Sequence, residues 1–261
     1  MSHAEELLAV AVEAASAAGE LLDERARRGA ERHVSSKSTP TDLVSEADLA
    51  SERLIRDLLA TRRPKDGFLG EEGGGRDGSS GLTWVVDPLD GTVNFLFGIP
   101  QWCVSVAVKD AQGPVAGAIF DPNRDELFTA LRGAKPMLNG DPLTASDCED
   151  PARAMVATGF AYDAQVRTAQ AKVLARLIPR VRDIRRFGSA ALDLAWTAAG
   201  RYDAYFERTV KPWDIAAGEL ICRCAGLCVI ELPAHENLPW GILVANQRLA
   251  DPLLELTAGP A

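Results

Sequence analysis

The sequence predicts a single domain of the α/β (α+β) class, a layered sandwich of helices and sheets. Its 261 residues are 47% hydrophobic and 25% charged, which is the balance of a globular protein with a sizeable core. Segments with helical and with strand-like spacing are mixed without strict alternation. No repeat, charge block or long linker separates them. We therefore expect one domain over 1–261 whose two subdomains, about 1–145 and 146–261, pack closely and join near 140–155.

The N-terminal part of the chain is expected to form two helices. Leucine and alanine recur at helical spacing over 4–28, and Gly29 suits the position just past a helix end. A second helix is expected to begin after Ser45, because Ser45 and Asp48 have the spacing of a capping box. Pro64 is expected to end that helix.

Strands and helices follow in mixed order. The apolar run 82–86 breaks abruptly at Asp87-Pro88, which is typical of a buried strand that ends in a turn. Glycine and proline punctuate the rest of the chain. The further expected elements are strands at 103–109, 115–121 and 126–131, a helix from about Val166 to Pro179, a short strand near Ile184, a helix that follows Gly188-Ser189 and ends at Gly200, a strand at 203–207, a helix from Pro212 to Cys224, and a strand at 227–232.

The charge balance limits the possible partners. Lysine and arginine number 28 and aspartate and glutamate 37, a net charge of -9, which argues against nucleic-acid binding. An anionic substrate would need a bound cation nearby. No run approaches the roughly 20 apolar residues of a membrane span, and the apolar stretch 7–18 lacks a basic leader. The five cysteines lack zinc-site spacing, so we expect reduced, buried thiols and a cytoplasmic location.

Acidic residues gather at strand ends and in loops. Glu71-Glu72 open a glycine-rich loop, Asp87 and Asp90 flank the end of a buried strand, and Asp214 lies in the first turn of a helix. Each acid alone also suits an ordinary turn, solvated loop or helix start. Together they predict an all-oxygen metal site, which suits Mg²⁺, with Mn²⁺ or Ca²⁺ as alternatives, better than zinc.

The segment Asp-Pro-Leu-Asp-Gly-Thr at 87–92 has a physical logic of its own. Pro88 stiffens the turn, so that two carboxylates and the Leu89 carbonyl can face one point. Gly91 and Thr92 begin a helical turn whose backbone N–H groups could hold a phosphate. Metal ions on one side and N–H groups on the other predict a phosphoryl site that needs no arginine.

Two stretches resemble the signatures of the inositol monophosphatase family. They are WVVDPLDGTVNF at 84–95 and KPWDIAAGELICRCAG at 211–226. The resemblance covers roughly residues 5 to 250 in family order. Its other segments are SKSTPTDLVSEAD at 36–48, GEE at 70–72, RGAKPMLNGDPL at 132–143, RFGSAALDLAWTAAGRYDAYFE at 186–207 and VANQRL at 244–249.

The resemblance implies a fold, a reaction and residue roles. The fold would be a five-layered α-β-α-β-α sandwich of the sugar phosphatase type, in a homodimer, and the reaction a lithium-sensitive hydrolysis that uses two or three Mg²⁺ ions. The implied metal ligands are Glu71, Asp87 and the Leu89 carbonyl for the first ion, and Asp87, Asp90 and Asp214 for the second. The implied catalytic residues are Glu71, Thr92 and Asp90. The implied substrate contacts are Gly91, Thr92, Gly188, Ser189, Ala190, Glu207 and Asp214, and the residues expected around the site are Lys37, Asp48 and Glu72.

The favoured function is hydrolysis of inositol monophosphate to myo-inositol and phosphate by metal-activated water. Glu207 suits a polyol because a carboxylate can accept hydrogen bonds from two neighbouring hydroxyls, although a strand-end surface charge is also possible. Histidinol phosphate, fructose bisphosphate or a phosphonucleotide would fit the same chemistry. An alternative of another class is a non-catalytic regulatory protein that keeps the fold and binds RNA or the transcription machinery.

Overall fold

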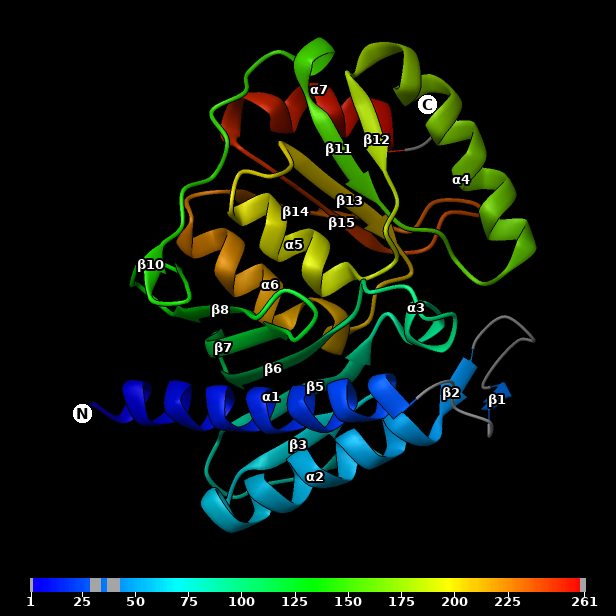
Figure 1. Ribbon diagram of the computed structural model, residues 1–261. Helices are drawn as coiled ribbons and strands as arrows, with labels where there is room; N and C mark the ends of the chain where they lie inside the picture. Colours follow the sequence, from blue (N-terminus) through cyan, green and yellow to red (C-terminus); the bar gives the residue numbers. More distant parts are fainter. Residues whose placement is uncertain (1, 29–33, 37–42, 259–261) are drawn as a thin grey trace.

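The computed structural model describes residues 2–28, 34–36 and 43–258 of the chain (Figure 1). The predicted residue Lys37 lies outside these ranges. The helices are α1 (His3–Arg28), α2 (Glu46–Arg62), α3 (Thr92–Leu96), α4 (Ala164–Leu177), α5 (Ala190–Ala198), α6 (Pro212–Cys224) and α7 (Gln247–Thr257), with short 3₁₀ turns at Pro151–Arg153 and Ile178–Arg180.

The described strands form two large sheets and a small pair. The strands of the larger sheet are β3 (Gly67–Gly70), β4 (Gly74–Arg76), β5 (Thr83–Asp90), β6 (Cys103–Asp110), β7 (Gly113–Asp121), β8 (Glu126–Leu131), β9 (Met137–Leu138) and β10 (Asp141–Pro142), in the order β10-β9-β8-β7-β6-β5-β3-β4. The strands of the second sheet are β11 (Met155–Thr158), β12 (Asp183–Arg185), β13 (Ala204–Arg208), β14 (Cys228–Leu232) and β15 (Gly241–Ala245), in the order β12-β11-β13-β15-β14. The pair is β1 (Val34–Ser36) with β2 (Leu43–Ser45).

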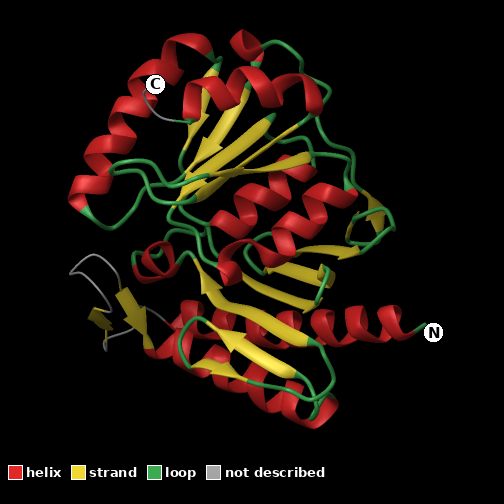
Figure 2. Cartoon of the chain, turned by 180° about the vertical axis from the view of Figure 1, so that it is seen from behind, coloured by secondary structure: helices red, strands yellow, loops and turns green. Residues whose placement is uncertain are grey.

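Helices cover both faces of each large sheet, which gives the five-layered α-β-α-β-α sandwich. Helices α1 and α2 lie on one face of the larger sheet, and α5 and α6 lie between the two sheets (Figures 1 and 2). Helices α4 and α7 cover the outer face of the second sheet (Figure 1). The predicted fold class is therefore confirmed.

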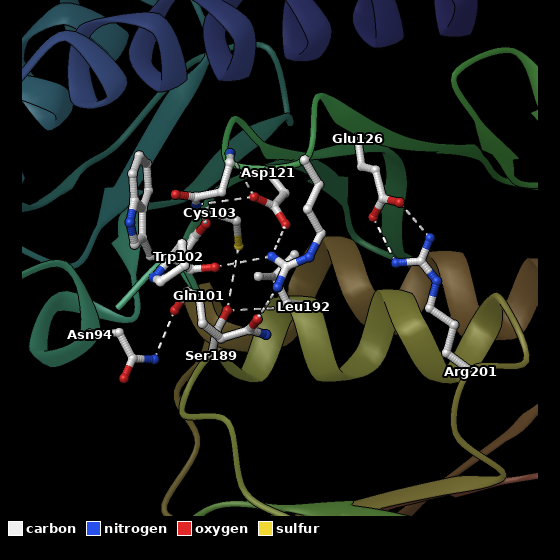
Figure 3. Close-up of polar contacts among 12 residues, drawn as sticks. Asn94, Gln101, Trp102, Cys103, Asp121, Glu126, Ser189, Leu192 and Arg201 are labelled. Carbon is white, nitrogen blue, oxygen red and sulfur yellow. Dashed lines mark hydrogen bonds and ion pairs between the residues drawn. The ribbon is translucent and has the colours of Figure 1, made fainter. Parts of the chain in front are cut away.

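Helix α5 shows why the middle layer has its composition. Each of its residues is buried, because one face meets the larger sheet and the other the second sheet. A helix surrounded on all sides needs small and apolar residues all round, as AALDLAWTA provides. Just past its end, Arg201 forms a bidentate ion pair with Glu126 of β8, at 2.7 and 2.5 Å, which ties the helix to the larger sheet (Figure 3).

Most predicted elements are present within a few residues, with one informative difference. Strand β5 does not stop at Asp87 but continues through Pro88 to Asp90. Its pairing with β6 shifts register between Asp87 and Asp90. Proline lacks the N–H that a regular ladder needs, so a bulge at this point lets the strand continue around it.

Several elements, mostly short strands, lie outside the sequence predictions, and β15 and α7 show two of the reasons. Strand β15 is a short run buried at all five positions, and such a run has no alternation that would separate strand from helix. Helix α7 continues through Pro252, a residue that normally ends a helix.

All five cysteines are free thiols, and two of them, Cys103 and Cys222, are buried. The expectation of buried thiols is wrong for the other three, which are partly exposed because they lie at element ends or in a connection. Among the described helices, none has the length and apolar character needed to cross a bilayer.

The close crossing of α5 and α6 predicts a stability effect at Gly218. A Cβ atom at this position would lie 2.6 Å from the side chain of Leu194 on α5. We expect Gly218→Ala to lower the free energy of unfolding by about 1–3 kcal/mol, measured by urea denaturation, because the added methyl group overpacks the middle layer. The control is Gly75→Ala, whose added Cβ would have only ordinary contacts. Equal stability of the two variants would contradict the tight crossing.

Candidate active site

Residues from distant parts of the chain meet in one cavity of about 390 Å³. Glu71 follows β3, the segment 87–90 ends β5, and Asp214 lies in the first turn of α6. The predicted site residues that line the cavity are Glu71, Asp87, Leu89, Asp90, Gly91, Thr92, Gly188, Ala190, Glu207 and Asp214.

The bulge in β5 places Asp87 and Asp90 side by side with the Leu89 carbonyl. Asp87 is 2% exposed, and its Oδ1 accepts a hydrogen bond from the Leu89 N–H at 3.1 Å. Asp90 Oδ2 accepts hydrogen bonds from the Ser189 hydroxyl at 2.6 Å and from the Ala191 N–H at 2.7 Å. The start of α5 therefore fixes the Asp90 carboxylate.

Ser189 is placed differently from its expected role as a substrate contact. It caps α5, is 1% exposed and does not line the cavity. Its hydroxyl donates a hydrogen bond to Asp90. The hydroxyl oxygen also lies 3.6 Å from the Cys103 sulfur, a contact drawn in Figure 3. In the structure, Ser189 therefore contacts the Asp90 carboxylate and does not face the cavity.

Asp214 is fixed by the start of its own helix. Pro212 occupies the first turn of α6, and Asp214 Oδ2 accepts the backbone N–H of Lys211 at 2.7 Å. The ordinary explanation of Asp214 as an acid in a first turn is therefore correct and compatible with its place on the cavity wall.

Asp48 links the capping of α2 to the cavity. Its Oδ2 accepts hydrogen bonds from the backbone and hydroxyl of Ser45 at 2.8 and 2.6 Å, which completes the predicted capping box. Its Oδ1 accepts the Thr92 hydroxyl at 2.7 Å. The Thr92 oxygen also lies 3.1 Å from the Leu89 carbonyl oxygen. The structure thus shows both contacts expected of Asp48.

Burial, reinforced by mutual repulsion, dominates the electrostatics of the acids. Burial, followed by the charges of Glu71, Asp90 and Asp214, raises the pKa of Asp87 well above its usual value. Burial likewise raises the pKa of Asp214, and it raises that of Asp90 to about 6 despite the hydrogen bonds from α5. Within the described ranges, no ion pair joins Asp87, Asp90 or Asp214 to a lysine or arginine.

These groups fit a hard divalent cation. The described side chains do not form a closed set of three or more ligands at metal-binding spacing. An open set of carboxylates is nevertheless what Mg²⁺ uses, because this ion keeps several waters and takes further oxygens from a substrate phosphate. Buried acids without a partner cation also have a strong electrostatic need for one.

The opposite wall carries the predicted alcohol-side residues. Burial raises the pKa of Glu207 to about 7, although the Tyr205 hydroxyl and Arg186 lower it. Glu207 accepts the Tyr205 hydroxyl at 3.0 Å. Any side chain at Gly159 would collide with the Glu207 carboxylate, so this glycine leaves the space that the carboxylate fills. Glu207 is therefore a partly buried acid on the cavity wall and not a strand-end surface charge.

Several cavity residues are not among the site residues expected from the sequence, although some lie inside the quoted motifs. Arg186, Lys211 and Trp213 line the wall, together with the segment 160–163 that follows β11. The last segment carries no motif, and only the layering of the two sheets brings it over the acids. Glu72, expected near the site, does not line the cavity.

Comparisons with known proteins agree with this geometry. The family model described as "Inositol monophosphatase family" matches residues 3–258. The chain belongs to the inositol monophosphatase family.

Individual members of the inositol monophosphatase family are similar over nearly the whole chain. The inositol-1-monophosphatase of Mycobacterium leprae is 45% identical over 233 residues, covering 85% of this chain and 80% of that protein. The Nus factor SuhB of Escherichia coli is 38% identical over 252 residues, covering 95% and 94%. The crystal structure of the extragenic suppressor protein SuhB of Bartonella henselae has a TM-score of 0.87 at 37% identity, covering 95% and 96%.

The raised pKa values predict that Mg²⁺ stabilises the protein more strongly at high pH. A folded-state pKa above the usual 3.8 means that Asp90 contributes stability at low pH and loses it as pH rises through about 6. A cation binds the deprotonated acids and relieves their repulsion. We expect Mg²⁺ to raise Tm more at pH 8 than at pH 5, measured by calorimetry, with NaCl of equal ionic strength as the control. An equal rise at both pH values would contradict the repulsion.

Proposed function

We propose that this protein is a Mg²⁺-dependent phosphomonoesterase that hydrolyses inositol monophosphate to myo-inositol and phosphate. One observation carries the proposal. A single cavity is lined by the acids Glu71, Asp87, Asp90 and Asp214 and by Thr92, whose hydroxyl donates to Asp48. Family membership supports the reaction class. The proposed ligands are those expected from the sequence. They are Glu71, Asp87 and the Leu89 carbonyl for the first ion, and Asp87, Asp90 and Asp214 for the second.

Bound Mg²⁺ would supply a more acidic water and charge neutralisation for the phosphate. The chain's own contribution starts at Thr92. Because the Thr92 hydroxyl donates its hydrogen to Asp48, its lone pairs are free to accept a hydrogen bond from the attacking water. The backbone N–H and hydroxyl of Ser45 hold the other oxygen of Asp48. The hydrogen bond from Thr92 to Asp48 therefore has a fixed direction. Glu71 would orient the same water, and the backbone N–H groups of Gly91 and Thr92 would receive the phosphate.

The proposed polyol end of the substrate lies against Glu207. Two adjacent hydroxyls can both donate to one carboxylate, and the Tyr205 contact holds this carboxylate in place. Gly188 and Ala190 leave room beside it because neither carries a large side chain. Arg186 and Lys211 on the same wall would favour a substrate with a second anionic group, which keeps bisphosphates among the candidates.

The second candidate function is regulatory. A relative in Escherichia coli is named a Nus factor, and it matches 95% of this chain. The buried acids at the cavity favour retained catalysis here, because a binding role alone would not require mutually repelling carboxylates.

We also propose that the chain forms a homodimer, which the exposed apolar side chains of Phe97, Ile99 and Phe187 support.

A substrate panel tests the proposal directly. We expect phosphate release from inositol monophosphate that requires Mg²⁺ and exceeds release from histidinol phosphate, fructose bisphosphate and a phosphonucleotide. Asp90→Asn should lower kcat/KM by at least about 100-fold, because it removes a ligand charge while leaving the fold intact. The matched control is Asp57→Asn on the exposed face of α2, which should keep full activity.

Each contrary result has a distinct meaning. Faster release from another ester would replace the substrate but keep the reaction. Near-normal Mg²⁺-dependent activity of Asp90→Asn would reject the ligand assignment. An inactive wild-type protein that binds the transcription machinery would favour the regulatory candidate.

A further inference from the structure

Helix α2 presents a buried polar face to the active site. Asp48, Ser51 and Glu52 lie three and four residues apart and therefore share one side of the helix. Their exposures are 0%, 0% and 4%. Buried polar groups need hydrogen-bond partners, and each of the three finds one at or next to a residue of the cavity wall. Asp48 and its bond to Thr92 belong to the mechanism above, whereas Ser51 and Glu52 have no role in it.

Glu52 holds the backbone next to Glu71. One of its oxygens, Oε2, accepts the backbone N–H of Glu72 at 2.8 Å. This N–H belongs to the peptide bond that joins Glu71 to Glu72. The other oxygen pairs with Arg56 one turn later, also at 2.8 Å. The guanidinium of Arg56 in turn lies over the ring of Phe68 on β3, 4.8 Å from its centroid.

The glycines on either side of Glu71 show that the Glu52–Arg56 ion pair packs closely against the loop that contains Glu71. A Cβ at Gly70 would collide with the Glu52 carboxylate. A Cβ at Gly73 would collide with both Glu52 and Arg56. Neither glycine has a positive φ, so a larger residue here would displace the ion pair but would not strain the backbone.

Ser51 holds the other half of the same proposed metal site. Its hydroxyl donates to the Pro88 carbonyl at 2.7 Å. The next residue is Leu89, whose carbonyl is a proposed ligand of the first ion. The two ligands specific to the first ion, Glu71 and the Leu89 carbonyl, are therefore both adjacent to peptides held by α2. Asp90 and Asp214 are instead held by α5 and α6.

We propose that Ser51 and Glu52, with Arg56 holding Glu52, are positioning residues that set the geometry of the first metal site. The inference rests on the proposed function for the identity of the site. Loss of these contacts would weaken the first ion more than the second, because α5 and α6 hold Asp90 and Asp214, the two ligands specific to the second ion. A residue that only stabilised the fold would affect both ions alike or neither.

The test measures Mn²⁺ binding to the substrate-free, full-length protein by electron paramagnetic resonance. For Glu52→Ala we expect one Mn²⁺ site to weaken by at least about tenfold, the effect typical of losing a group that orients a ligand, and the other to change by less than twofold. The matched control is Ile55→Val, a buried change on the same helix that removes no hydrogen bond or charge. It should lower Tm while leaving both Mn²⁺ affinities unchanged. Equal affinities in Glu52→Ala and wild type would overturn the proposal.

Hydrogen exchange of the metal-free protein gives a second readout. The Glu72 amide should exchange at least about tenfold faster in Glu52→Ala than in Ile55→Val, because its acceptor is gone. Glu52→Gln keeps an acceptor oxygen but lacks the negative charge that pairs with Arg56, so it should show an intermediate effect. It replaces Glu52→Ala in this test if that variant does not fold. Unchanged exchange in both Glu52 variants would overturn the proposal. A wild-type protein that binds no Mn²⁺ would reject the proposed function, while the exchange rates would still decide the positioning.

Discussion

The structure depends on holding several carboxylates together against their mutual repulsion. Asp87 is buried and Asp90 and Asp214 are partly buried, and the charges of neighbouring acids raise the pKa of all three. Backbone from different layers holds these acids: the bulge in β5, the start of α5 and the first turn of α6. The five-layered arrangement makes this possible, because α5 and α6 lie between the sheets with their starts beside the end of β5. A site of this kind stores unfavourable energy that a bound cation would release.

The supports of the site come from two sides that differ in chemistry. From the middle layer, N–H groups and a serine hydroxyl hold Asp90, so these supports are donors facing an acid. From the outer layer, α2 offers both donors and acceptors, and these bind backbone next to the cavity instead of acid side chains. This division explains why one short stretch of α2 is polar on the face that would otherwise be part of the apolar core.

Local sequence features predicted the parts of the site whose geometry is local. Pro88 between two acids, the Ser45–Asp48 capping box and Pro212 before Asp214 each fix a conformation within a few residues. The contacts of Glu52 with the loop at Glu71, and the place of Arg186 and the segment 160–163 on the cavity wall, arise only when distant layers meet. The same limit applies to β15, which is an apolar run until its neighbours β13 and β14 define it as a strand.

The most direct measurement of the central claim is anomalous diffraction from a crystal of this protein soaked in Mn²⁺. Because the ion scatters anomalously, its position is found independently of any assumption about its ligands. The account predicts peaks within ligand distance, about 2.0–2.6 Å, of carboxylate oxygens of Asp87, Asp90 and Asp214, and of Glu71 and the Leu89 carbonyl. Ordered Mn²⁺ elsewhere on the protein, with none between these acids, would contradict it.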